Sequence, residues 1–145
     1  MELQAQKCRL VMTNGCFDLL HPGHLKYLAE ARALGDHLLA ALNSDSSIRR
    51  LKGPRRPVRP QADRAQMLAG LEMVDSVVIF EEDTPSELIE KLRPDILVKG
   101  GDWPADQIAG GPQTLARGGR VLSLSLLDGY STTNLIDRIL DVYGR

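Results

Sequence analysis

Two histidines and a glycine-containing turn are the residues of this sequence best suited to bind a phosphate. They lie in the stretch Thr13-Asn14-Gly15-Cys16-Phe17-Asp18-Leu19-Leu20-His21-Pro22-Gly23-His24. His21 and His24 are three residues apart, so at the start of a helix both rings can lie on one side. A helix N-terminus presents free N–H groups and a partial positive charge, and Gly15 lets a phosphate approach the backbone closely. We therefore expect an anion site at which both imidazoles donate hydrogen bonds to phosphate oxygens.

Two other interpretations of these side chains stay open at this point. Either histidine taken alone is more often an ordinary surface or core residue than a functional one. Cys16, His21 and His24 are also soft metal ligands at close spacing, but a suitable fourth ligand is missing nearby and the glycine turn would have no role. The sequence thus favours a phosphate site, and we predict no metal-ligating residue.

The elements that must position this stretch alternate between strand and helix. Apolar and β-branched runs predict buried strands at 9–13, 37–42, 77–80, 95–99 and 120–124, and apolar residues at helical spacing predict helices between several of them. Alternating strands and helices imply parallel strand pairs with right-handed crossovers and a ligand site beyond the carboxyl ends of the strands. We expect an α/β fold, a Rossmann-like doubly wound sheet of about five parallel strands, as a single domain over residues 1–145.

Local signals refine three connections. The polar cluster at 43–47 predicts a loop. Thr84 as cap and Pro85 at the first position predict a helix start. Ser131 to Asn134 open the last helix, and its inward-facing residues are expected to be Leu135, Ile136, Ile139, Leu140 and Tyr143.

Two further segments could contact phosphates or a base. Residues 48–60 contain six basic residues, three prolines and no acid, which suits either a solvated loop or a mobile segment that neutralises a phosphate-rich ligand. Gly100-Gly101-Asp102-Trp103 follows an expected strand and is either a turn with a tryptophan at the core edge or a ligand contact. Three consecutive hydroxyls at 131–133 exceed what one helix cap needs, which suggests a second anion site.

The motifs together resemble those of the nucleotidyltransferase superfamily with the HxGH motif, whose members join a nucleoside triphosphate to a phosphorylated partner and release pyrophosphate. The resemblance implies that His21, His24 and Lys52 are catalytic, with Lys52 on a segment that closes over the reacting phosphates. It also implies a set of nucleotide-binding residues: Thr13, Asn14, Gly15, Cys16, Phe17, Asp18, Asn43, Arg64, Lys99, Gly101, Asp102, Trp103, Gly129, Ser131, Thr132 and Thr133. From sequence alone, by contrast, we expect Arg64 at the surface. One departure concerns the last helix, where many adenylyltransferases have an arginine three positions after the last threonine; this chain has Ile136 there and Arg138 two positions later.

Composition excludes several classes of protein. The chain has 145 residues, 43% hydrophobic and 26% charged, and a formal net charge of -1, so we expect an ordinary globular protein and no nucleic-acid partner. The two cysteines form no disulfide framework, and neither a signal peptide nor a run of roughly 20 apolar residues is visible. We expect a cytoplasmic protein without a membrane partner, and the sequence leaves a homodimer open.

Within the superfamily, the matching segments most resemble the adenylyltransferases that act on D-glycero-β-D-manno-heptose 1-phosphate. This resemblance implies ATP and a sugar 1-phosphate as substrates and Mg²⁺ as cofactor, in the synthesis of ADP-heptose for lipopolysaccharide. Two alternatives stay open. The chain could be a glycerol 3-phosphate cytidylyltransferase, which shares the HxGH and Ser-Thr-Thr motifs, or a non-catalytic adenine-nucleotide binding module.

Overall fold

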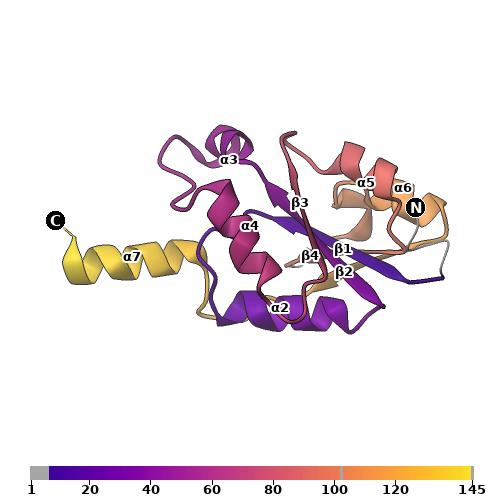
Figure 1. Cartoon of the computed structure of the whole chain (residues 1–145), viewed down its shortest axis with the longest axis horizontal. Helices are drawn as coiled ribbons and strands as arrows, with labels where there is room; N and C mark the ends of the chain where they lie inside the picture. The colour runs from indigo at the N-terminus through magenta and orange to yellow at the C-terminus, as the bar shows by residue number, and fades with distance from the viewer. Residues whose placement is uncertain (1–6, 102, 145) are drawn as a thin grey trace.

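A five-stranded parallel sheet forms the centre of the protein, in a computed structural model that describes residues 7–101 and 103–144 (Figure 1). The order of its strands is β3-β2-β1-β4-β5, and every neighbouring pair is parallel. The strands are β1 (Leu10–Gly15), β2 (His37–Asn43), β3 (Ser76–Phe80), β4 (Ile96–Gly100) and β5 (Arg120–Leu124). The predicted doubly wound α/β sheet is confirmed.

Helices cover both faces of this sheet. They are α2 (Pro22–Arg32), α3 (Asp45–Lys52), α4 (Gln61–Ala69), α5 (Ser86–Leu92), the 3-10 helix η1 (Ala105–Gln107), α6 (Gly111–Ala116) and α7 (Thr132–Tyr143). Residues of α2 and α4 belong to one apolar core cluster, and residues of α5 and the segment after η1 belong to another. The two clusters are separated by the sheet.

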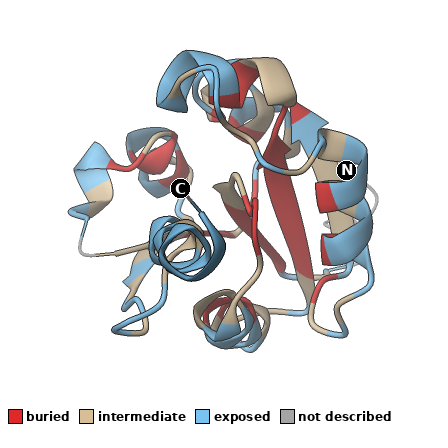
Figure 2. Ribbon diagram, turned by 90° about the vertical axis from the view of Figure 1, so that its left-hand side faces the viewer, coloured by how far each residue is buried: buried red, intermediate tan, exposed pale blue. Residues whose placement is uncertain are grey.

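Side-chain alternation along the strands explains the two cores. Successive residues of a strand point to opposite faces, so Val11 packs in the first cluster while Leu10 and Met12 pack in the second. All three are completely buried, and Figure 2 shows the central strands as the most buried part of the molecule. Strands covered on both faces are apolar throughout, which is why β1 and β2 lack an apolar-polar alternation in the sequence.

The order of the strands reverses direction between β1 and β4. From β1 the chain moves outward through β2 and β3, and it then returns to the other side of β1 to form β4 and β5. In open parallel sheets ligands bind beyond the carboxyl ends of the strands at this switch point. The histidine stretch follows β1, and Lys99 lies near the end of β4, so the fold places both at this point.

Two connections differ from the prediction. Residues 43–47 were expected to form a loop, but Ser44 caps α3 by accepting a hydrogen bond from the Ser47 N–H at 3.1 Å. Serine and aspartate favour helix starts as much as turns, so the polar cluster begins a helix here. Thr84 is not the cap of α5, because this helix starts at Ser86 after Pro85 and its N-cap residue makes no side-chain hydrogen bond.

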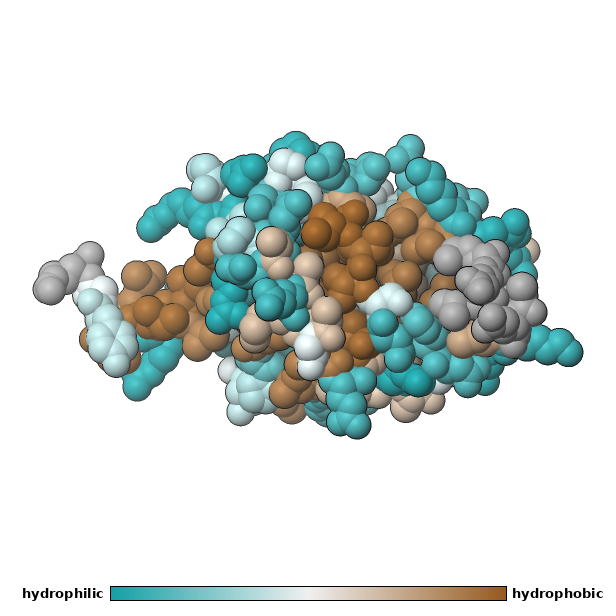
Figure 3. Space-filling model, viewed as in Figure 1, coloured by the Kyte–Doolittle hydropathy of each residue, from teal (hydrophilic) through white to brown (hydrophobic). Residues whose placement is uncertain are grey.

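The predicted burial of the last helix is wrong. α7 extends away from the sheet and its neighbouring helices (Figure 1), and none of its residues is buried. Leu135, Ile139, Leu140 and Tyr143 are exposed, and only Ile136 of the predicted inward residues is partly buried. Figure 3 shows apolar atoms along this projecting helix. The apolar period correctly predicted a helix, but the face that it marks does not contact this chain's core.

Candidate active site

The two histidines begin α2 and are held by hydrogen bonds to the backbone. His21 is the N-cap residue, with its Nδ1 accepting from the Gly23 N–H at 3.1 Å. His24 Nδ1 accepts from the His21 N–H at 3.2 Å, which completes a capping box. The ring centroids lie 3.9 Å apart, and Pro22 occupies the first helical turn as expected. The two imidazoles are therefore fixed side by side, as the spacing predicted.

Their backbone contacts determine which nitrogen can serve a ligand. Because each Nδ1 accepts a hydrogen bond, the proton of each neutral ring is on Nε2. Burial lowers the pKa of His24 to about 4, with a further contribution from the charge of His21, and burial also lowers the pKa of His21. Near pH 7 both rings are then neutral Nε2–H donors, which suits contact with a phosphate oxygen.

A cavity of about 380 Å³ lies beside these rings, and we call it the histidine cavity. The N-terminus of α7 forms another part of its wall, where Ser131 Oγ caps the helix by accepting from the Asn134 N–H at 2.9 Å. Its other predicted lining residues are Asn14, Gly15, Cys16, Phe17, Lys52, Lys99, Thr132 and Thr133. Two helix N-termini, those of α2 and α7, thus meet at one cavity, and each favours an anion.

A second cavity of about 430 Å³ adjoins the first, and we call it the tryptophan cavity because Trp103 lines it. The two cavities share five residues: Asn14, Gly15, Cys16, Lys52 and Lys99. Burial and the nearby charge of Lys52 lower the pKa of Lys99, while Cys16 acts in the opposite direction. Two lysines whose charges repel each other between two cavities form a site for a negatively charged group.

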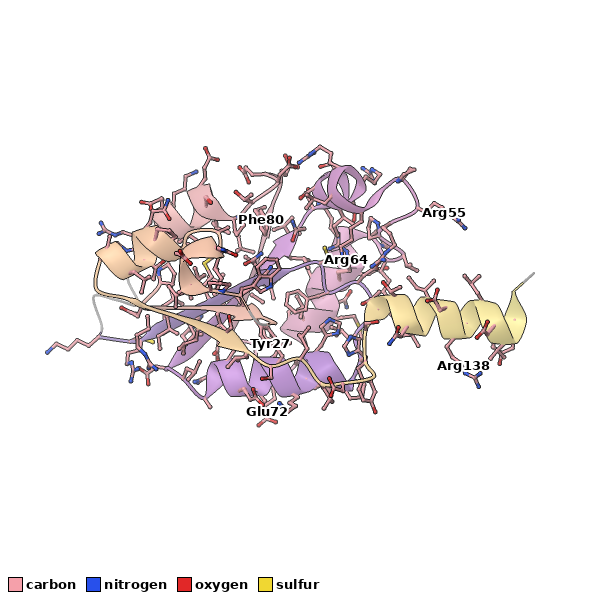
Figure 4. The ribbon with its side chains drawn as sticks, turned by 180° about the vertical axis from the view of Figure 1, so that it is seen from behind. Tyr27, Arg55, Arg64, Glu72, Phe80 and Arg138 are labelled. Carbon is pink, nitrogen blue, oxygen red and sulfur yellow. The ribbon has the colours of Figure 1, made fainter. Side chains whose placement is uncertain are left out.

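Four of the predicted binding residues are buried in the protein instead of lining the histidine cavity. Thr13 is fully buried, and its hydroxyl is hydrogen bonded to the Tyr27 hydroxyl. Asp18, Asn43 and Arg64 are 2%, 5% and 1% exposed. Asn43 does line the tryptophan cavity. The expectation of a surface position for Arg64 is wrong, and Figure 4 shows this side chain between α4 and the sheet.

Two predicted glycines, Gly101 and Gly129, and the predicted Trp103 differ in where they lie relative to the two cavities. Gly101 and Gly129 have φ angles of 102° and 83°, which residues other than glycine rarely adopt. Neither glycine is among the residues that line the two cavities. Trp103 lines the tryptophan cavity, not the histidine cavity, and Asp102 lies outside the described residues.

Sequence reasoning missed several lining residues. Tyr130 stacks on His21 with 6.0 Å between ring centroids and an interplanar angle of 24°. Gln107 contributes to the tryptophan cavity. Arg56 was not missed, since the resemblance places it with Lys52 on the segment over the phosphates, and it lines the histidine cavity. The position of Tyr130 directly before the Ser-Thr-Thr motif was a usable signal, whereas nothing local in the sequence marks Gln107. Phe17, which was predicted, has a φ of 47°, a strained conformation that is typical of functional turns.

The described residues give two further results. Residues 7–101 and 103–144 contain no group of three or more His, Cys, Asp or Glu side chains placed to hold a metal ion. Within the same residues, no helix is both long and apolar enough to span a bilayer.

Comparison with known proteins agrees with this geometry. The cytidylyltransferase-like family model matches residues 12–138, which includes the histidine stretch and the start of α7. The chain belongs to the cytidylyltransferase-like family. The resemblance to HxGH nucleotidyltransferases is thereby confirmed.

Individual relatives of this cytidylyltransferase-like chain include longer proteins. It is 60% identical over 134 residues to the bifunctional protein HldE of Syntrophotalea carbinolica, covering 92% of this chain and 27% of the relative. It is 56% identical over 141 residues to the HldE of Geobacter sulfurreducens, covering 97% and 29%. A solved structure, the lipopolysaccharide core biosynthesis protein from Thermoplasma volcanium, is similar with a TM-score of 0.69 and 27% identity, covering 86% of this chain and 99% of that one. The chain thus spans less than a third of the two curated relatives.

Proposed function

We propose that this chain is an adenylyltransferase that transfers AMP from ATP to D-glycero-β-D-manno-heptose 1-phosphate. The products are ADP-heptose, a precursor of lipopolysaccharide, and pyrophosphate. The observation that carries the proposal is the pair of adjoining cavities with Lys52 and Lys99 between them. A reaction between two phosphorylated substrates needs two binding spaces that meet where the phosphates react. Similarity to HldE proteins and to a lipopolysaccharide core biosynthesis protein supports the choice of substrates.

In the proposed arrangement ATP occupies the histidine cavity and the sugar phosphate occupies the tryptophan cavity. A phosphate oxygen of the sugar substrate attacks the α-phosphorus of ATP and forms the new P–O bond. The bond from the α-phosphorus to the bridging oxygen breaks, and pyrophosphate leaves with its electron pair. The attacking oxygen carries no proton near pH 7, so a general base is not needed.

The protein's task in this reaction is to stabilise the charge that develops on the phosphates. His21 and His24 present neutral Nε2–H donors, and Lys52 and Lys99 add positive charge from the other side. The N-terminus of α7, with Ser131 to Thr133, lines the same cavity and can bind the departing pyrophosphate. Donors fixed in advance at such positions are a large source of rate enhancement.

Magnesium would enter this site as the counter-ion of ATP. The described residues hold no carboxylate or histidine cluster that could form a separate metal site, so the phosphate oxygens would supply its ligands, as is common for this ion. It would neutralise part of the phosphate charge.

A pyrophosphate-release assay tests the proposal. Purified protein with magnesium should release pyrophosphate from ATP plus D-glycero-β-D-manno-heptose 1-phosphate. It should release far less from CTP plus glycerol 3-phosphate, by about 10⁴ in specificity, because a site that hydrogen-bonds sugar hydroxyls leaves polar groups unpaired with the smaller substrate. The reverse preference would identify a glycerol 3-phosphate cytidylyltransferase. ATP binding without pyrophosphate release from any sugar phosphate would identify a non-catalytic nucleotide-binding module.

We also propose that the protein is cytoplasmic and forms a homodimer. Cys8 and Cys16 are both free thiols, which fits the reducing cytoplasm. A homodimer could cover the exposed apolar face of α7, and sedimentation or light scattering would measure it.

A further inference from the structure

We propose that Arg64 and Asp18 are positioning residues, which hold Lys52 and Arg56 at the phosphate site before a substrate binds. This inference rests on the proposed function. By resemblance both residues were expected to bind the nucleotide. Their side chains are instead buried and bonded to other parts of the protein.

Arg64 connects segments that are far apart in the sequence. From α4 its Nη1 donates to the carbonyl oxygens of Cys16 at 2.9 Å and Asn43 at 2.8 Å. Its Nη2 donates to Asp45 Oδ1 at 2.7 Å, and its Nε to the Arg59 carbonyl oxygen at 2.9 Å. One guanidinium thus joins the turn after β1, the end of β2, the start of α3 and the loop after α3.

Asp18 holds the same loop from the opposite side. Its Oδ1 accepts from the Arg59 N–H at 2.9 Å, and its Oδ2 accepts from the Val58 N–H at 2.8 Å and from Arg56 Nε at 3.1 Å. Asp18 lies in the turn between β1 and the two histidines. A buried carboxylate with three donors is well satisfied, and its replacement by an amide turns one acceptor oxygen into a donor, so at least one of these groups loses its acceptor.

The two residues together fix the segment that carries the basic groups of the site. Lys52 is the last residue of α3, whose start contacts Arg64 through Asp45. The loop 53–60 follows Lys52, carries Arg56, and is tied to Arg64 and Asp18 near its end. Both ends of the segment 45–59 are therefore attached to the turn that also leads to His21. Of the seven groups that Arg64 and Asp18 contact, five are backbone groups of site-forming segments. A shift in either side chain therefore moves the site itself.

The segment 45–59 is consequently not a lid that moves freely before substrates bind. Sequence reasoning favoured a mobile basic loop that closes on the substrates, whereas these contacts fix its attachment before binding. Arg55, which directly precedes the anchored Arg56, extends away from the body into solvent in Figure 4. The anchored residues, by contrast, provide a preorganised site, which lowers the cost of arranging charges around the phosphates.

The test compares Asp18→Asn with Asp75→Asn. Asp75 is a control with the same types of partner, because its Oδ2 also pairs with an arginine, Arg32 at 2.8 Å, and accepts a backbone N–H, from Leu38 at 2.8 Å, away from both cavities. Both changes should lower thermal stability. We expect Asp18→Asn to reduce kcat about 10- to 100-fold with a smaller change in the KM for ATP, and Asp75→Asn to leave kcat within about twofold. Equal kcat in the two folded variants would overturn the inference.

A second measurement does not depend on the reaction. Amide hydrogen exchange at 53–60 should be faster in Asp18→Asn than in the wild type and unchanged in Asp75→Asn, even if the substrates proposed above prove wrong. Unchanged exchange would refute the positioning role whatever the activity.

If Asp18→Asn did not fold, Arg56→Lys would remove the Nε contact and keep the charge. The inference then requires faster amide exchange at 53–60 in Arg56→Lys than in the wild type. A double-mutant cycle of Asp18→Asn with Arg56→Ala should be strongly non-additive, because one residue acts through the other.

Discussion

At the scale of single residues, the hydrogen bonds of the two imidazoles decide their chemistry. Backbone N–H groups occupy both Nδ1 atoms, which leaves the Nε2–H groups for a ligand. Burial lowers the pKa of both rings, and that of His24 to about 4, and Phe17 packs beside His24 with 5.5 Å between ring centroids. A donor fixed in this way contributes most when charge develops on the phosphate.

His24→Ala should therefore reduce turnover far more than it weakens ATP binding. Loss of one preorganised donor typically costs about 100- to 1000-fold in rate. The measurement is kcat from pyrophosphate release together with the ATP dissociation constant from calorimetry. A variant with wild-type turnover would remove His24 from the mechanism.

The same histidines should make stability depend on pH. The pKa of His24 falls from 6.5 to about 4 on folding because of burial, so the unfolded chain binds more protons between these values. Stability should thus be full above about pH 6.5 and should decrease as the pH falls toward 4. Urea unfolding at several pH values measures this dependence, and His24→Gln should flatten it. Asp18, whose pKa is lowered by its backbone and Arg56 hydrogen bonds against the effect of burial, adds a loss only at lower pH.

At the scale of elements, the first turn of α7 and the rest of this helix have different surroundings. Its first turn contributes to the histidine cavity, and Thr132 Oγ1 donates to the Leu19 carbonyl oxygen at 3.3 Å. Beyond this turn none of the helix residues is buried, and Arg138 extends outward into solvent (Figure 4). The proposed phosphate contact therefore needs only the start of the helix and not burial of its length.

Ile139→Glu should accordingly have little effect on the stability of the monomer. Ile139 is 47% exposed, whereas Leu28 of α2 is fully buried. We expect a change below about 0.5 kcal/mol for Ile139→Glu and a loss of about 2–5 kcal/mol for Leu28→Ala. Thermal and urea unfolding of both variants measure the difference. A large loss for Ile139→Glu would show that α7 packs against another surface in solution.

At the scale of the whole molecule, the arrangement proposed above gives the two substrates different lining residues. Trp103 lines the cavity opposite to the histidines, so Trp103→Ala should raise the KM for the sugar phosphate about three- to tenfold, from the loss of ring contacts. The KM for ATP should change little. Steady-state kinetics with each substrate varied in turn measures both values. A selective effect on ATP would instead place the base at Trp103.

The alternation of strands and helices, the parallel sheet and the position of the histidine turn could all be predicted from the amino-acid sequence. These depend on apolar period, on glycine and proline, and on motifs within a few residues, all of which are local properties. It also indicated the residues around the phosphates, because their motifs follow strands whose carboxyl ends meet at one edge. The start of α3 at 45 was missed since serine and aspartate suit turns and helix caps equally.

Which of the motif residues line a cavity and which are buried in contacts with other segments became visible in the folded chain alone. Arg64 and Asp18 have charged side chains that are usually exposed, and their burial depends on partners that lie as far as 48 and 41 residues away in the chain. The placement of Trp103 on the tryptophan cavity and the exposure of α7 likewise depend on how distant segments pack. Such contacts join residues whose separation in sequence carries no local signal, so they could be obtained only from the folded chain.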